Sequence, residues 1–257
     1  MIHPTFGRRR FLTLSVPGVA IGVAGCLGSS NGFEYPPGFS EDGVESHALG
    51  YGSPMMDLDS IKGDYRHLRM EDDVERVTES TFEVNRVDQR YRRMLTHPWN
   101  EEIERVYSYF ADEVLYERIR YADGRDEYRR HENPGSIRDI NLQFRDLANL
   151  SVAAHWAQGV TFELAEINET VQPKQAIYHA NTQGMEGSPP IQRQVEQDGS
   201  FVEGEMSFMI DEDGMLHSFW VLAEFEQVTW GSEIEYQDFN DVTVTEPDWV
   251  DEARDVA

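Results

Sequence analysis

The 257-residue sequence contains a single cysteine, Cys26, and only two lysines. A single cysteine excludes intrachain disulfides from any account of stability. The sequence also lacks an apolar run of the roughly 20 residues that a membrane-spanning helix requires. Its longest mostly apolar stretch, residues 12–25, has 14 residues, a length typical of a signal-peptide core.

Positive charge is scarce, since 22 basic residues stand against 48 acidic ones and the formal net charge is −26. Residues 1–25 hold three arginines and no acid, so the rest of the chain has an excess of 29 negative charges. Such an excess destabilises a compact domain by self-repulsion in dilute buffer, and molar salt screens it. The composition is therefore typical of a haloarchaeal protein. It excludes nucleic acid and an anionic membrane surface as electrostatic partners, while 39% hydrophobic content argues against disorder.

The N-terminus carries an export signal followed by the cysteine. Arg8, Arg9, Phe11 and Leu12 form a twin-arginine motif, and small residues precede Cys26 after the apolar stretch. The block resembles the signal peptide and lipobox of an exported lipoprotein. This resemblance implies a lipid on Cys26 and a protein on the outer face of the cell membrane; the alternative is an unmodified thiol in a cleaved or retained signal.

The chain divides into four parts on this interpretation: a signal peptide at residues 1–25, a lipidated tether at 26–33, one domain at 34–250 and an acidic tail at 251–257. The central part is long enough for one domain with a substantial core. We find no internal repeat with a period of 20–50 residues.

Strand patterns dominate the first half of the domain. Glycines and a proline break any helix over residues 44–60, and residues 64–96 read as strand. Residues 114–130 predict a hairpin around Asp123-Gly124. A two-residue turn there places Ile119 opposite Tyr128, Arg120 opposite Glu127, and Glu117 opposite Arg130.

One helix follows, and then more strands. Ile137, Ile140, Phe144 and Leu147 recur at helical spacing, which predicts one amphipathic helix that continues through Trp156 and ends at Gly159. Strands are expected at 160–167 and 176–180, a second hairpin at 204–210 and 215–225, and final strands at 234–239 and 242–245. Apolar residues on both faces of 215–225 predict a central strand.

This order predicts an α+β fold with a curved antiparallel sheet and one or two helices on one face. Two segments are similar to the opening and closing segments of a group of haloarchaeal lipoproteins: residues 35–44 (YPPGFSEDGV) and residues 240–249 (NDVTVTEPDW). Those proteins resemble in outline the LolA and LppX lipoprotein-carrier fold. The resemblance implies an incomplete barrel, and it departs from the family where a long first helix is expected after Val44.

The strand residues Phe208, His217, Phe219 and Trp220 are the candidate ligand-binding residues, because they are aromatic and the sheet is expected to curve around a ligand. An ordinary filled core explains the same residues, and His217 is then a core histidine with a hydrogen-bond partner. Asn149-Leu150-Ser151 and Asn168-Glu169-Thr170 are candidate glycosylation sites at Asn149 and Asn168.

No set of residues predicts catalysis, a metal or a cofactor. Residues 28–32 match the nucleophile-elbow pattern but lie in the tether, without the strand and helix that the motif needs. The acidic run at 211–214 would place Met209 and Trp220 at calcium-ligand positions, which neither can fill.

Two functions therefore stay open. The first is a membrane-anchored lipoprotein that binds an apolar or lipid-like ligand in its sheet. The second is a scaffold that docks to another envelope protein and has no ligand cavity. A hydrolase is a third and weaker hypothesis, since the sequence contains no catalytic set.

Overall fold

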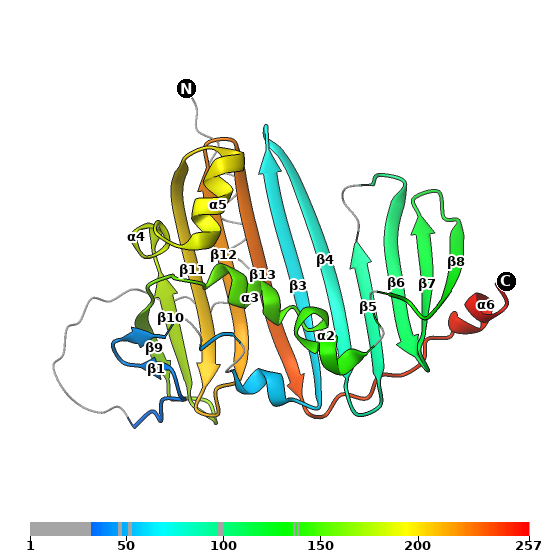
Figure 1. The fold of residues 1–257 in the computed structure, drawn as a ribbon, viewed down its shortest axis with the longest axis horizontal. Coiled ribbons are helices and arrows are strands. Elements are labelled where there is room, and N and C mark those ends of the chain that lie inside the picture. Colours follow the sequence, from blue (N-terminus) through cyan, green and yellow to red (C-terminus); the bar gives the residue numbers. More distant parts are fainter. Residues whose placement is uncertain are drawn as a thin grey trace. The chain divides into compact units, whose positions relative to one another are not determined.

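The computed structural model describes residues 32–45, 48–50, 53–96, 100–135, 137 and 139–256. The chain separates into two compact units, residues 1–32 and residues 33–257. The second unit is built on one large antiparallel sheet, which Figure 1 shows with helices on its near side. A two-stranded sheet of β1 (Phe39–Ser40) and β2 (Gly43–Val44) precedes it.

The large sheet has eleven strands in the order β8-β7-β6-β5-β4-β3-β13-β12-β11-β10-β9. The outermost strands β8 and β9 do not pair with each other, so the curved sheet is open. The strands are β3 (Ser60–Glu71), β4 (Val74–Asn85), β5 (Arg90–Thr96), β6 (Ile103–Ala111), β7 (Val114–Tyr121), β8 (Asp126–Glu132), β9 (Glu163–Asn168), β10 (Gln175–Ala180), β11 (Phe201–Asp211), β12 (Leu216–Phe225) and β13 (Val228–Phe239).

Two meanders make up this sheet. Strands β3–β8 pair in chain order, and so do β9–β13. The pairing of β3 with β13 joins the two, with Tyr65 opposite Ile234. The expected α+β fold with an open antiparallel sheet is confirmed.

Helices lie over one side of the sheet, which we call the helix side. They are α2 (Ile140–Leu147), α3 (Leu150–Trp156), α4 (Thr182–Met185) and α5 (Pro189–Asp198), and a short 3-10 helix spans Pro54–Asp57. These helices outnumber the one or two that we expected. The expectation missed α5, although it has a proline at its first position and Gly199 directly after its last residue, both of which are helix-boundary signals.

The helix predicted from residue 137 to residue 156 is two helices. Asn149 has a φ of 56°, a left-handed conformation that interrupts a right-handed helix and that asparagine tolerates better than most residues. The break turns α3 relative to α2, so that Ile140 and Phe144 of α2 and Leu150 and Ala153 of α3 are all buried. A continuous helix was therefore the wrong prediction.

The β7–β8 hairpin exists, but its predicted register was wrong by one residue. Ile119 lies opposite Glu127, Arg120 opposite Asp126 and Glu117 opposite Arg129. The cause is a three-residue loop in which Gly124 has a φ of 86°, whereas the prediction assumed a two-residue turn.

The predicted β11–β12 hairpin exists, with Phe208 opposite Phe219 and Met206 opposite Val221. β12 is an interior strand, as predicted, but only its helix side is fully covered. Phe219 is inaccessible to solvent, whereas Trp220 and Leu222 on the other side are half-buried. The expected burial of both faces was wrong for this second side.

The C-terminus departs from expectation too. Residues 242–245 are extended but are not a strand, because they lie across the sheet rather than along its edge. Val242 and Val244 are buried there. Residues expected in an acidic tail form α6 (Val250–Arg254), which contacts β7 and β8.

Two hydrophobic clusters stabilise the unit. The larger one lies between the helices and the helix side of the sheet. The smaller one lies on the opposite side, which we call the outer side, where Tyr109, Tyr116, Val244 and Val250 pack together.

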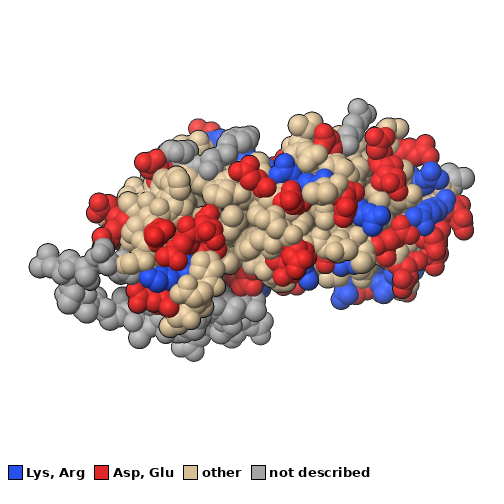
Figure 2. All heavy atoms as spheres, turned by 90° about the horizontal axis from the view of Figure 1, so that it is seen from below, with Lys and Arg blue, Asp and Glu red and all other residues tan. Residues whose placement is uncertain are grey.

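Acidic side chains cover much of the surface. In Figure 2, which looks at the molecule from below the view of Figure 1, Asp and Glu are spread widely while most Lys and Arg lie in the right-hand half. The strands β5–β8 occupy that half in Figure 1.

Candidate functional site

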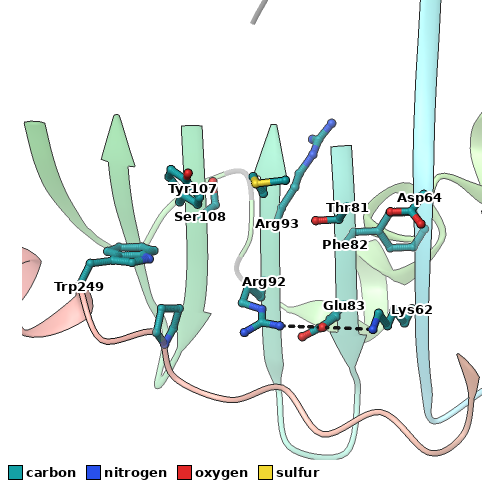
Figure 3. A pocket seen from close by; sticks show the side chains of 12 residues that line it. Lys62, Asp64, Thr81, Phe82, Glu83, Arg92, Arg93, Tyr107, Ser108 and Trp249 are labelled. Carbon is teal, nitrogen blue, oxygen red and sulfur yellow. Dashed lines mark hydrogen bonds and ion pairs between the residues drawn. The ribbon is translucent and has the colours of Figure 1, made fainter. Parts of the chain in front are cut away.

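A groove on the outer side is the candidate site. It has a volume of about 410 Å³ and lies across β3–β6 next to the C-terminal segment, residues 240–249. Its lining residues are Lys62, Asp64, Thr81, Phe82, Glu83, Arg92, Arg93, Met94, Tyr107, Ser108, Pro247 and Trp249. Figure 3 shows Trp249 and Tyr107 at one end and Lys62 and Asp64 at the other.

One row of the groove is charged. Glu83 accepts a hydrogen bond from Nη2 of Arg92 at 2.7 Å and lies 4.0 Å from Nζ of Lys62, as the dashed lines in Figure 3 show. The registers β3–β4 and β4–β5 bring the three side chains together, because Lys62, Glu83 and Arg92 are directly opposite one another. The second carboxylate oxygen of Glu83 is buried without a hydrogen-bond partner. Two cations with one carboxylate leave this row with a local positive excess.

The next row is less polar. Met94 and Tyr107 face each other across β5 and β6, and Trp249 and Pro247 complete this wall from the C-terminal segment. The groove therefore joins an apolar, aromatic wall to a charged row.

The C-terminal segment is held to the sheet by hydrogen bonds. The amide N–H of Val242 donates to Oγ of Ser60 at 3.0 Å, and Nδ2 of Asn85 donates to the carbonyl oxygen of Val242 at 2.8 Å. Ser60 is buried, so its hydroxyl needs such a partner. The segment continues from Val242 to Pro247 and Trp249, which line the groove.

At the end of the groove away from Trp249, Asp64 is partly buried (Figure 3). Its carboxylate accepts a hydrogen bond from Gln237. Burial raises the pKa of Asp64, while Lys62 and the hydrogen bond act in the opposite direction. Asp64 is therefore a polar lining residue at that end of the groove.

A second polar and aromatic cluster lies on the helix side. Nε1 of Trp230 donates to Oδ2 of Asp198 at 2.6 Å, and the guanidinium of Arg69 lies 4.9 Å from the Trp230 ring. The His67 ring is 5.4 Å from Trp230, and burial lowers the pKa of His67 because it disfavours the charged imidazole. These contacts fix the C-terminal end of α5 to β13, which is a structural role.

The candidate ligand-binding residues are not in one place. Phe208 and Phe219 are 1% and 0% exposed in the larger core, where Phe208 stacks on Tyr178 at 5.2 Å. Trp220 is on the outer side and away from the groove lining. Nε2 of His217 is 2.8 Å from Oδ2 of the buried Asp211.

The Asp211 carboxylate also accepts the amide N–H groups of Asp213 and Met215 in the hairpin turn. A plain turn accounts for these bonds. Within the described residues, no group of three or more His, Cys, Asp or Glu side chains is placed to hold a metal.

The remaining candidate residues lie at the surface or outside the described part. Asn149 and Asn168 are half-exposed, and Oδ1 of Asn168 accepts a hydrogen bond from the Thr170 hydroxyl at 2.6 Å. Arg8, Arg9, Phe11, Leu12 and Cys26 are outside the described residues. No helix in the described part of the chain is both long and apolar enough to cross a membrane.

Sequence reasoning missed the groove because its lining comes from four strands and a segment about 140 residues further along the chain. One signal was available in the sequence. Arg92 and Met94 are two residues apart, as are Tyr107 and Tyr109, so each strand places both of its residues on one outward face, where polar and apolar side chains mix.

No protein-family model matches the sequence, and no curated protein matches it. Solved structures resemble the fold in outline. The lipoprotein LppX of Mycobacterium tuberculosis matches with a TM-score of 0.40 and 9% identity over 74% of this chain and 90% of that one.

A LolA superfamily protein of Nitrosomonas europaea matches with a TM-score of 0.24 and 11% identity over 75% of this chain and 90% of that one. A putative outer membrane lipoprotein-sorting protein domain of Vibrio parahaemolyticus has a TM-score of 0.25 and 6% identity, over 75% and 89% of the two chains. All three similarities have a TM-score below 0.5.

Proposed function

We propose that this protein is an extracytoplasmic lipoprotein, anchored through Cys26, that holds an amphipathic, lipid-like ligand in the outer-side groove. The groove is the observation that supports the proposal. Its volume of about 410 Å³ lies within the roughly 300–1,000 Å³ of small-molecule sites. It combines an apolar wall with a few fixed charges, as ligand sites do.

The groove suits a ligand with two chemical ends. Met94, Tyr107 and Trp249 offer apolar surface to a hydrocarbon chain, which gains free energy by leaving water. Charged side chains on both sides of this apolar wall, such as Arg92 and Arg118, offer donors to a polar group. Binding, rather than turnover, is the proposed role.

The scaffold remains the second candidate, and one observation favours it. The helix side, where we first expected a ligand, is filled by side chains such as Phe208, Phe219 and Ile234, all at most 1% exposed. A scaffold would use the outer side to contact an envelope protein and would hold no small molecule.

Mass spectrometry of an organic extract of the purified protein tests the proposal. We expect a co-purifying lipid at a fixed ratio to protein. Met94→Glu should abolish it, because an unpaired charge on the apolar wall disfavours hydrocarbon. Leu142→Glu is the matched control, since Leu142 is 84% exposed on α2. A lipid-free extract, or one equally rich in lipid after Met94→Glu, would contradict binding in the groove.

The anchor has a separate test. Cys26→Ser should release the protein from membranes and remove the mass of the lipid, while its thermal unfolding stays unchanged. A variant that stays in the membrane fraction with an unchanged mass would contradict lipidation of Cys26.

A further inference from the structure

Three arginines lie close together on the outer side, beside the aromatic end of the groove. Arg105 of β6 is directly opposite Arg120 of β7. Arg118, two residues before Arg120, points to the same side because strand residues two apart share a face. We call Arg105, Arg118 and Arg120 the arginine group.

Carboxylates neutralise this group only in part. Arg118 donates to Oδ2 of Asp126 at 2.6 Å, and Arg120 donates to both oxygens of the same carboxylate at 3.1 Å. Two guanidinium groups therefore share one carboxylate. Nε of Arg105 lies 3.6 Å from Oε1 of Glu104, and both of those side chains are close to half exposed.

The placement of Arg105 opposite Arg120 is unfavourable by itself. Like charges directly opposite each other on neighbouring strands are destabilising, and this chain has more than twice as many acids as bases with which to pair them. In addition, the Nε–H of Arg118 is buried without a hydrogen-bond partner. The arginine group therefore has more cationic hydrogen-bond donors than the described residues around it have acceptors.

The arginine group is continuous with the groove. Arg118 is directly opposite Tyr107, and its guanidinium lies 5.6 Å from the centre of the Tyr107 ring. Tyr107 lines the groove. If the apolar part of a ligand lies along Met94 and Tyr107, the polar end of that ligand therefore reaches the arginine group.

We propose that the arginine group binds the anionic headgroup of the ligand, a phosphate or a sulfate, while the apolar chain of that ligand lies in the groove. This inference rests on the proposed function and names the chemical class of the ligand. The planar guanidinium matches the oxygens of phosphate and sulfate with paired N–H donors. Such a ligand relieves the repulsion between Arg105 and Arg120.

Calorimetric titration of the purified protein, in 0.5 M and in 2 M NaCl, tests the assignment with three probes. Dodecyl phosphate has the chain and the anion, dodecyl maltoside has the same chain with an uncharged sugar headgroup, and inorganic phosphate has the anion alone. We expect dodecyl phosphate to bind at least tenfold more tightly than either of the others. The double variant Arg105→Gln/Arg120→Gln should remove this preference and leave the affinity for dodecyl maltoside unchanged.

Arg129→Gln is the matched control, because Arg129 is on the same hairpin but points to the helix side, where it pairs with Glu127 at 2.7 Å. Arg105→Lys/Arg120→Lys retains the charges without the forked donors, and it should recover only part of the preference. Thermal melting of each variant verifies that it is folded. We expect Arg105→Gln to keep or raise the melting temperature, since it removes the repulsion with Arg120.

The outcomes separate the two proposals. Equal affinity for dodecyl phosphate and dodecyl maltoside, unchanged in the double variant, would overturn the headgroup site and leave the groove. Binding of inorganic phosphate that is lost in the double variant, with no binding of either dodecyl probe, would support the anion site and overturn the lipid-like ligand. Absence of binding by all three probes would overturn both.

Discussion

The two ends of the sheet are built on different chemistry. Residues 163–239, which include β9–β13, contain 16 acidic residues and two basic ones, whereas residues 90–132, which include β5–β8, contain ten acidic residues and nine arginines. We call these the acidic half and the arginine half. The acidic half has large apolar side chains beneath helices, such as Phe208 and Phe219.

The arginine half has a smaller core, on the outer side, under the C-terminal segment and α6. Its strands are cross-linked by ion pairs, among them those of Arg118 and Arg120 on β7 with Asp126 on β8. The difference shows that one sheet can be stabilised mainly by apolar burial at one end. At the other end, ion pairs and packing against the C-terminal segment and α6 stabilise it.

Truncation of each core is expected to have the largest effect. Phe219→Ala should cost about 3–5 kcal/mol of unfolding free energy and destabilise the whole unit, because β12 is interior. Trp249→Ala should cost roughly 3 kcal/mol, at the lower limit of that range, since Trp249 is 9% exposed. Its effect should be confined to β6–β8, as measured by amide hydrogen exchange.

Leu142→Ala, at an exposed position of α2, is the control for both truncations and should be nearly neutral. If Trp249→Ala accelerates exchange in β10–β12 as much as in β6–β8, the two halves unfold as one and the comparison fails.

Salt should affect the halves unequally. Between 0.1 M and 2 M NaCl the Debye length falls from about 10 Å to below 3 Å, and repulsion among the many carboxylates of the acidic half is screened. Amide protection should therefore rise more in β9–β13 than in β5–β8, where the ion pairs are screened as well. Equal gains in both halves would show that salting-out of apolar surface is the main effect.

Low pH should affect mainly the arginine half. Hydrogen bonds from Arg120 and Arg118 lower the pKa of Asp126 to about 2, below its ordinary value of 3.8. This pairing therefore contributes fully above pH 4 and is lost as the pH falls towards 2. Between pH 5 and pH 2.5, the amide protection factors of β7 and β8, which are corrected for the intrinsic exchange rate at each pH, should fall in the wild type.

Asp126→Asn should make those protection factors less dependent on pH, and low already at pH 5. Glu132→Gln, which changes an exposed carboxylate on the same strand, is the control. A pH profile of Asp126→Asn that follows the wild type would show that this carboxylate does not hold the hairpin together.

The smallest expected effect is at the hairpin loop of the arginine half. Gly124 has a φ of 86° with no atom within 4 Å of a built Cβ, so Gly124→Ala introduces backbone strain without a clash. It should cost about 1 kcal/mol. Gly135→Ala has equal space and no left-handed φ, so it should be neutral. Equal melting temperatures for the two variants would argue against the three-residue loop.

Local patterns predicted much of this fold. The turn residues at Asp213-Gly214 and the alternation in β11 and β12 predicted the hairpin, in which a register shift between Met209 and Ile210 sets Phe208 opposite Phe219. The same reasoning failed by one residue at Asp123-Gly124, because a two-residue and a three-residue loop both accept Asp-Gly. In the observed register, Arg118 and Arg120 both donate to Asp126.

The site was less predictable than the fold. The groove depends on Trp249 and Pro247 lying over β5 and β6, and nothing in residues 240–249 specifies contact with a strand so distant in sequence. Phe208 and Phe219 were predicted to bind a ligand because they are large aromatic residues of the sheet. Large apolar residues in an interior strand more often fill a core than line a cavity, and here they fill it.

The pairing of β3 with β13 has a consequence for how the chain folds. Each meander forms from strands close in sequence, but this single seam joins Ser60–Glu71 to Val228–Phe239. Closing a loop of that length is entropically costly, and non-local strand pairing slows folding. We therefore expect the two meanders to form early and separately. The pairing of β3 with β13 is expected to be the slow step. A chain that ended before β13 would leave both seam edges, β3 and β12, open to the pairing of one molecule with another.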